Sequence, residues 1–127
     1  MGSEELDKAR YFSLGTFRKS GEVVRTPVWF AGTNGVYFVF SAGDAGKVKR
    51  LRGSDRAEVA LCDVRGKVLG SWHDARARLL TSELEIDQAL AALRQKYSWQ
   101  MWLADVGSSI TGKFRKRAYI RVELTED

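Results

Sequence analysis

Short runs of β-branched and aromatic residues, separated by glycine-containing turns, limit the folds open to this chain more than any other feature. Residues 11–19 and 22–31 are two such runs, and Ser20-Gly21 between them is typical of a hairpin turn. Residues 32–35 form a second turn with an Asn-Gly pair, which tolerates positive φ. Neighbouring strands joined by hairpins exclude an alternating parallel α/β sheet, so we expect a small antiparallel barrel with helices packed on it.

The other strands follow from the same patterns. Residues 36–40 are apolar on both faces and predict a strand buried on both sides. Residues 57–64 and 68–80 predict two more strands, joined by a turn at 65–67, with a bulge expected at Gly70. The last segment alternates strictly, so a sixth strand should bury one face, which carries Ala118, Ile120, Val122 and Leu124.

Helices are predicted at four places. Acidic residues after Ser3 indicate a short first helix that ends near Arg10. Val48 and Leu51 suit one buried stripe on a short helix over 47–52. Ser82 and Glu85 form a capping box before an amphipathic helix with a stripe of Ile86, Leu90, Leu93 and Tyr97. A second, shorter helix would carry the apolar residues from 99 to 110 and break at Gly107, which makes a helical pair before the last strand.

Composition excludes several classes of function. The chain has 127 residues, one Cys and one His, which leaves no disulfide framework and no clustered zinc ligands. His73 and Asp74 are neighbours on a strand and point to opposite faces, so a surface histidine is favoured over a catalytic base. The length suggests a single domain over residues 1–127, without an apolar run that could span a membrane. The acidic start predicts neither a signal nor a transit peptide, so we expect a cytoplasmic protein.

Basic residues gather between Lys47 and Arg56 and again between Lys113 and Arg117. Cations in the first turns of a helix oppose its dipole, so an arrangement shaped for stability alone would place acids there. A bound phosphate reverses that preference, and Gly46 would let the backbone approach it. A solvated basic face is the alternative. Nucleic-acid binding is not favoured, because aromatic residues do not alternate with the first basic cluster.

The run from Arg25 to Phe30 is the second candidate site. Pro27 removes a ladder donor and marks an edge or a bulge in the strand. Arg25 stands inside an apolar run, and a buried guanidinium requires an anion. Trp29 taken alone is read as a core residue.

Three segments together resemble the pyridoxamine 5′-phosphate oxidase-like split β-barrels, and more closely the branch of probable F420-dependent oxidoreductases from actinobacteria. They are Tyr11-Phe12-Ser13-Leu14-Gly15-Thr16-Phe17, Arg25-Thr26-Pro27-Val28-Trp29-Phe30 and the run from Val39 to Arg52, which contains Gly46-Lys47-Val48-Lys49-Arg50. The resemblance extends from about Tyr11 to Leu124. It implies a six-stranded antiparallel split β-barrel that forms a homodimer, with the cofactor in a groove at the dimer interface.

The resemblance also implies a set of cofactor-binding positions. Arg25 and Lys47 match phosphate-binding positions, with Gly46 and Arg50 in the same helical segment as Lys47. The strand facing the flavin or deazaflavin ring would supply Thr26, Pro27, Val28 and Trp29. Phe40 and Ser41 match the pair near the ribityl phosphate, and Ser71 and Trp72 would approach the cofactor of the other subunit.

Two departures from the parent oxidases narrow the expected function. Gly46 stands where those oxidases carry an arginine, and their C-terminal substrate-binding segment is absent, so oxidation of pyridoxamine phosphate is not expected. We expect an oxidoreductase that transfers a hydride between coenzyme F420 and a small molecule, since the basic residues after Lys47 suit the acidic tail of F420. The alternatives are an FMN-dependent oxidoreductase or a non-catalytic flavin carrier. The sequence identifies neither a catalytic residue nor a metal ligand.

Overall fold

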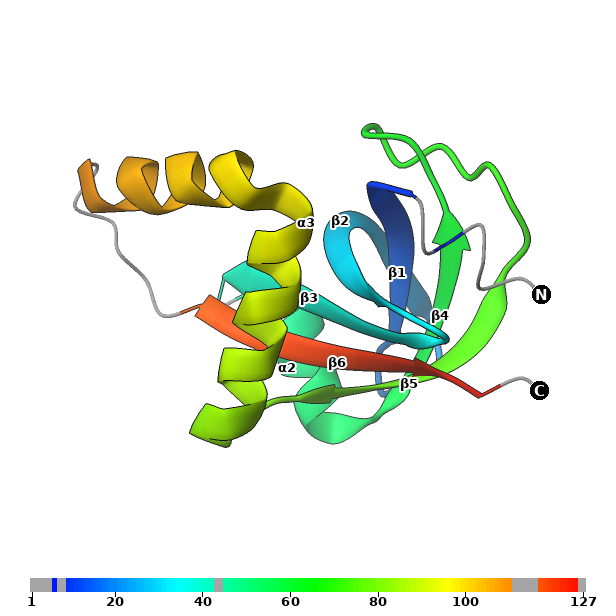
Figure 1. Ribbon diagram of the computed structural model, residues 1–127. Coiled ribbons are helices and arrows are strands. Elements are labelled where there is room, and N and C mark those ends of the chain that lie inside the picture. Colours follow the sequence, from blue (N-terminus) through cyan, green and yellow to red (C-terminus); the bar gives the residue numbers. More distant parts are fainter. Residues whose placement is uncertain (1–5, 7–8, 43–44, 111–116, 126–127) are drawn as a thin grey trace.

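Six antiparallel strands close into a barrel in the order β1-β2-β3-β6-β5-β4 (Figure 1), which confirms the predicted fold class. The computed structural model describes Leu6 and residues 9–42, 45–110 and 117–125, and for residues 42, 97–110 and 117 it describes the secondary structure alone. The strands are β1 (Tyr11–Phe17), β2 (Val23–Thr33), β3 (Val36–Ala42), β4 (Arg56–Leu61), β5 (His73–Leu79) and β6 (Arg117–Leu124). β4 pairs with β1, and this pairing closes the barrel.

Both predicted hairpin turns are confirmed. In the β1–β2 turn, Gly21 has a φ of 93°, and its N–H donates to the Arg18 carbonyl over 2.8 Å. In the β2–β3 turn, Asn34 and Gly35 have φ values of 57° and 81°. Two consecutive left-handed residues match the right-handed twist of the flanking strands, which explains the Asn-Gly pair at this position.

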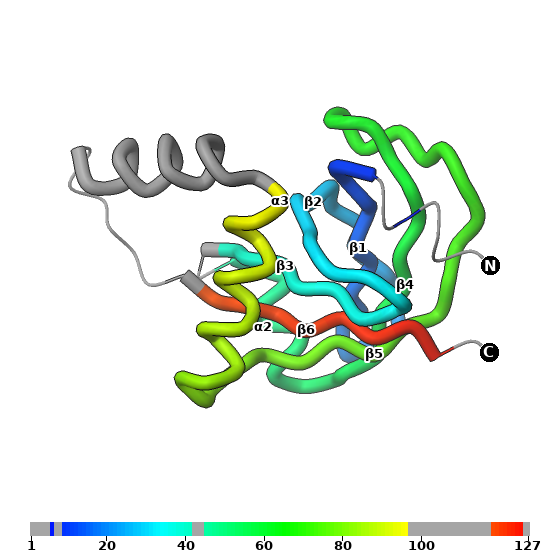
Figure 2. Tube along the Cα trace, in the orientation of Figure 1, coloured from blue at the N-terminus to red at the C-terminus, as the bar shows by residue number. Residues whose placement is uncertain are grey.

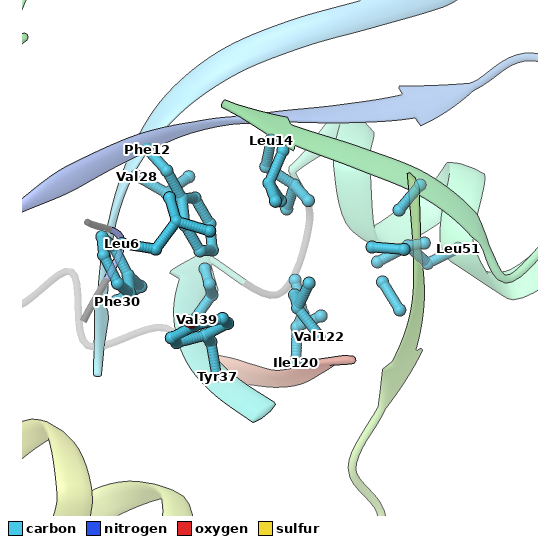
Figure 3. Packing of buried hydrophobic residues seen from close by; sticks show 14 residues of the cluster. Leu6, Phe12, Leu14, Val28, Phe30, Tyr37, Val39, Leu51, Ile120 and Val122 are labelled. Atoms are coloured by element: carbon cyan, nitrogen blue, oxygen red, sulfur yellow. The ribbon is translucent and has the colours of Figure 1, made fainter. Parts of the chain in front are cut away.

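The hydrophobic core fills the inside of the barrel (Figure 3). Phe12 stacks on Phe30 with ring centroids 4.1 Å apart, and Tyr37 meets both rings edge-on. Ile120 and Val122 are fully buried, so the alternation of the last strand is confirmed. On β3 the inward-facing Tyr37 and Val39 are fully buried, whereas the outer-face residues Val36, Phe38 and Phe40 are half-buried rather than buried as predicted.

Two helices cover the barrel. The short helix α2 (Gly46–Gly53) buries Val48 and Leu51, as predicted, and packs against β1 and β5. The long helix α3 (Glu83–Ile110) packs across β2, β3 and β6. Figure 2 traces both helices against the barrel. No helix in the described part of the chain is long and apolar enough to cross a membrane.

The predicted helical pair is wrong, because a single helix runs over Glu83–Ile110. The sequence between the two predicted helices contains neither proline nor glycine to end the first of them. The buried face of α3 is also displaced from the prediction: Ala89 and Leu93 are fully buried, whereas Leu90 is only half-buried. The predicted first helix lies mostly outside the described residues, of which Leu6 is buried in the core.

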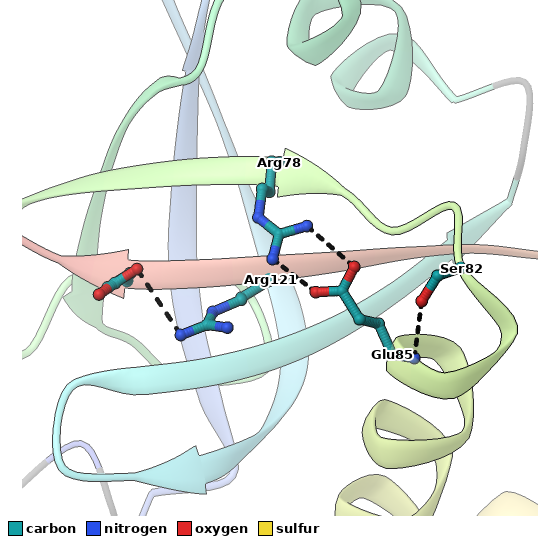
Figure 4. A network of polar contacts seen from close by, with 5 residues as sticks. Arg78, Ser82, Glu85 and Arg121 are labelled. Atoms are coloured by element: carbon teal, nitrogen blue, oxygen red, sulfur yellow. Dashed lines mark hydrogen bonds and ion pairs between the residues drawn. The ribbon is translucent and has the colours of Figure 1, made fainter.

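Only half of the predicted capping box forms. The Glu85 N–H donates to Ser82 Oγ over 3.1 Å, but the Glu85 carboxylate accepts two hydrogen bonds from Arg78 (Figure 4). The Arg78 guanidinium therefore lowers the pKa of Glu85. This ion pair joins the start of α3 to β5 instead of completing the cap.

The predicted strand over 68–80 is wrong in its first half. β5 begins only at His73, and residues 63–72 form a loop with one isolated bridge between Cys62 and Val68. Val64 and Leu69 on this loop are 64% and 61% exposed. The turn predicted at 65–67 is confirmed, since Gly66 has a φ of 90° and its N–H donates to the Asp63 carbonyl over 3.0 Å. Gly70 lies in the loop before β5, so the bulge expected there is not part of a strand.

Candidate functional site

A pair of cations stands at the beginning of α2, where the sequence predicts a phosphate site. Lys47 is half-buried, and burial, followed by the charge of Arg50, lowers its pKa. Burial, followed by the charge of Arg18, also lowers the pKa of Arg50. Among the described residues, neither Lys47 nor Arg50 is paired with a carboxylate. An anion bound here would relieve the repulsion among these charges.

Arg50 is held in place by two features of its surroundings. Its Nε donates a hydrogen bond to Thr16 Oγ1 over 2.6 Å, and Thr16 is fully buried in β1. Its guanidinium folds back over Gly46, where a Cβ atom would lie 2.8 Å from Nη1. The absence of a side chain at Gly46 leaves the Arg50 guanidinium this position.

The N-cap residue of α2 supplies no side-chain acceptor for the first backbone N–H groups of the helix. Ala45 is the N-cap residue and makes no side-chain capping hydrogen bond, and the first turn contains no acid. Asp44, the other residue considered for this cap, lies outside the described residues. Lys47 and Arg50, together with these backbone donors, fit the phosphate group of a flavin or deazaflavin.

Arg25 lies on the outer face of the barrel and is not buried as predicted. Its side chain is 47% exposed, and it forms an ion pair with Glu58 over 2.8 Å. Gly15 lies between these two residues in the sheet, opposite Arg25 on β2 and opposite Glu58 on β4. A Cβ at Gly15 would lie 2.7 Å from Glu58 Cγ, so any residue larger than glycine would force the Glu58 side chain to move. The anion that Arg25 requires is thus supplied within the chain.

The 63–72 loop folds back over the same outer face. The ring of Trp72 lies 4.2 Å from the Arg25 guanidinium, in a cation–π contact. A Cβ on Gly66 would lie 3.6 Å from Pro27 Cδ, so the tip of the loop reaches β2. The Asp63 carboxylate accepts the N–H groups of Arg65 and Lys67 and tightens the loop. Ser71 is exposed.

The predicted aromatic positions form a third group, beneath α3. Trp29 and Phe40 meet edge-on at 6.2 Å and pack with Ala31 and Leu93. Trp29 is half-buried and packs against this cluster, so it is not the fully buried core residue that the sequence suggested.

Of three further predicted positions, Val28 and Ser41 are buried and Thr26 is half-buried. Val28 belongs to the barrel core, and Ser41 is 8% exposed near the end of β3. Thr26 Oγ1 is buried and has no hydrogen-bond partner among the described residues. This unpaired hydroxyl lies on the strand that the resemblance assigns to the cofactor ring.

The predicted residues therefore fall into three groups: Lys47 and Arg50 with Gly46, then Arg25, Pro27 and Trp72, and finally Trp29 and Phe40. Sequence reasoning missed Thr16, which positions Arg50, and Glu58, which pairs with Arg25. A glycine inside a strand indicates a close approach, so Gly15 could have pointed to the outer-face ion pair.

Cys62 and possible metal ligands add no chemistry to these groups. Burial, followed by the charge of Asp63, raises the pKa of the Cys62 thiol to about 11. The residues that the structure describes contain no group of three His, Cys, Asp or Glu side chains that could hold a metal ion.

The family model for pyridoxamine 5′-phosphate oxidase matches residues 3–126, nearly the whole chain. The chain belongs to this family. No curated protein matches it.

Solved structures with low sequence identity share the fold. The protein Atu2129 from Agrobacterium tumefaciens superposes with a TM-score of 0.70 at 18% identity, over 95% of this chain and 51% of that one, so this chain spans about half its length. A FAD-binding protein from Mesorhizobium loti gives 0.62 at 19% identity, over 97% and 84% of the two chains. The heme storage protein HutZ from Vibrio cholerae gives 0.68 at 15% identity, over 98% and 87%.

Proposed function

We propose that this member of the family is an oxidoreductase that uses coenzyme F420, with FMN as the alternative cofactor, and transfers a hydride to or from a small molecule. The observation that carries the proposal is the cation pair of Lys47 and Arg50 at the start of α2, where Ala45 offers no side-chain cap and the described residues offer no carboxylate partner. A half-buried lysine with a lowered pKa, next to a fixed guanidinium, gains stability from a bound anion.

The role of the protein in such a reaction is to bind and orient. The cofactor supplies the hydride chemistry when bound. Lys47 and Arg50 would hold its phosphate, and the outer face around Pro27, with Trp72 over Arg25, would lie against its ring. Because the cofactor supplies the chemistry, the protein needs no acid–base pair with shifted pKa values at these positions, and the described residues contain none there.

F420 and FMN differ in the amount of negative charge that they carry. F420 carries an acidic tail in addition to its phosphate, and the basic residues that follow Lys47 on α2 favour a ligand with more negative charge than FMN. An FMN-dependent enzyme or a carrier without turnover remains the competing proposal. The FAD-binding protein with the same fold makes a flavin a reasonable ligand to test.

A parallel titration tests the proposal. Purified protein is titrated with F420 and with FMN at one ionic strength, and cofactor fluorescence reports binding. We expect tighter binding of F420, followed by oxidation of reduced F420 when reducible small molecules are screened as acceptors. Tighter binding of FMN would replace the F420 proposal with a flavin protein, and binding without turnover by any acceptor would indicate a carrier. If neither cofactor binds, the proposal fails.

We also propose that the working form is a homodimer, with the cofactor groove between subunits. Three large hydrophobic residues are exposed on the 63–72 loop, namely Val64, Val68 and Leu69. A second copy of the chain would cover them. Light scattering should give twice the chain mass, and the substitution Leu69→Asp should shift it toward the monomer. A monomeric wild type would reject this assembly.

A further inference from the structure

A pocket lies between the end of β1 and the outer side of α2, apart from the Lys47 position. Its volume is about 390 Å³, within the usual size range of small-molecule sites. One wall comes from the β1–β2 hairpin and the other from α2 and the residue after it. The lining residues are Phe17, Arg18, Lys19, Ser20, Lys49, Arg50, Gly53 and Ser54.

All the charged residues that line this pocket are cations. Two cations, Arg18 and Lys19, stand on the hairpin wall, and two more, Lys49 and Arg50, stand on the helix wall. The eight lining residues include no carboxylate. Glu22 pairs with Arg18 over 3.1 Å, but it does not line the pocket. The charge of Arg18 also contributes to the lowered pKa of Arg50, so the two walls repel each other across the pocket.

The pocket also has an apolar surface. Phe17 lines it, and the guanidinium of Arg56 lies 4.0 Å from the centre of that ring. Gly53 leaves the opposite side open, because a Cβ there would meet no atom within 4 Å. A flat apolar body therefore has a ring to pack against and space to enter.

We propose that this pocket binds a small organic dianion, with its flat apolar body against Phe17 and one anionic group facing the cations of each wall. The two-sided placement of the cations favours two separated negative groups over one, since each wall then receives its own charge-assisted hydrogen bonds. The site is distinct from the Lys47 position proposed for the cofactor, although Arg50 borders both.

The test uses three probes that share a ring and differ in charge: isophthalate, benzoate and benzamide. Each is titrated into the full-length protein at constant ionic strength, with amide shifts followed by NMR. We expect saturable binding of isophthalate, about tenfold weaker binding of benzoate because one charge-assisted contact is lost, and no binding of benzamide. Shifts should concentrate at residues 17–20 and 49–54.

Two variants and a matched control locate the site. Lys49→Ala should weaken isophthalate binding about tenfold. Gly53→Trp should fill the pocket and abolish binding while the circular dichroism spectrum stays unchanged. Lys67→Ala removes the same charge from an exposed position outside the pocket and should leave binding intact. Equal losses in Lys49→Ala and Lys67→Ala, equal affinity for benzoate and isophthalate, or no saturable binding would each overturn the proposal.

Titrations of the same samples with F420 and with FMN separate this proposal from the proposed function. Isophthalate binding without binding of either cofactor would leave the pocket standing and reject the cofactor site. Isophthalate binding that is lost in Lys47→Ala but kept in Gly53→Trp would instead place the anion at the cofactor site and reject this pocket.

Discussion

Replacing Gly15 with alanine should destabilise the barrel through the side chain of Glu58. The φ of Gly15 is not in the left-handed region, so alanine is compatible with the backbone and should by itself stabilise the fold by about 0.5–1 kcal/mol. The new Cβ, however, would lie 2.7 Å from Glu58 Cγ and 3.0 Å from Val23 Cγ2. Overpacking of this kind costs about 1–3 kcal/mol, so we expect a net loss of about 1–2 kcal/mol in the free energy of unfolding.

A double-mutant cycle isolates this contact. Glu58→Ala removes the side chain that the new Cβ meets and should cost about 1 kcal/mol, as expected for a partly exposed ion pair with Arg25. In the Glu58→Ala background, Gly15→Ala should be close to neutral, because only the contact with Val23 remains. The coupling energy should therefore be about 1–2 kcal/mol.

Urea unfolding of the wild type, the two single variants and the double variant measures the cycle. Independent sites add to within about 0.5 kcal/mol. Additivity within that limit would refute the argument that Gly15 is required by the path of Glu58 toward Arg25.

Three further predictions follow from burial and charge. Leu93→Ala should lower the free energy of unfolding by about 2–5 kcal/mol, and Leu90→Ala by clearly less, because Leu93 is fully buried and Leu90 only half-buried. Equal losses in urea unfolding would contradict the assigned helix face. FMN affinity should fall as pH rises from neutral toward 10.5, because the lowered pKa of Lys47 means that its charge is lost below the usual value for lysine. Fluorescence titrations at several pH values should show this fall in the wild type and a flatter profile in Lys47→Ala. The Cys62 thiol should react with iodoacetamide at pH 8 far more slowly in the folded protein than in guanidinium chloride, because burial raises its pKa to about 11; similar rates in both conditions would show that the thiol is accessible.

Much of the barrel could be predicted because its strands have strong local patterns. The Asn34-Gly35 turn and the alternation through Ile120 and Val122 depend on neighbouring residues alone, and the structure confirms both. The strands predicted over 57–64 and 68–80 extend too far toward the predicted turn at 65–67, because Val64, Val68 and Leu69 are exposed on a loop. Hydrophobicity alone could not separate an exposed loop from a buried strand here.

The environments of the site residues were harder to predict than their positions. Arg25 was expected to be buried and to need an external anion, but its partner Glu58 lies 33 residues away on a strand that does not pair directly with β2. That contact depends on the closure of the barrel through β1. The hydrogen bond from Arg50 to Thr16 likewise spans 34 residues, and no local pattern in the sequence announces it.

The most direct test of the cofactor site is an FMN titration of three proteins: the wild type, Lys47→Ala and Arg94→Ala. Both variants lose one positive charge, but Lys47 stands at the start of α2, whereas Arg94 is exposed on α3. We predict that Lys47→Ala weakens binding by about 1.5–3 kcal/mol, the range for a hydrogen bond to a charged group, whereas Arg94→Ala binds like the wild type. Equal affinities in all three proteins would contradict the assignment of Lys47 to the cofactor site.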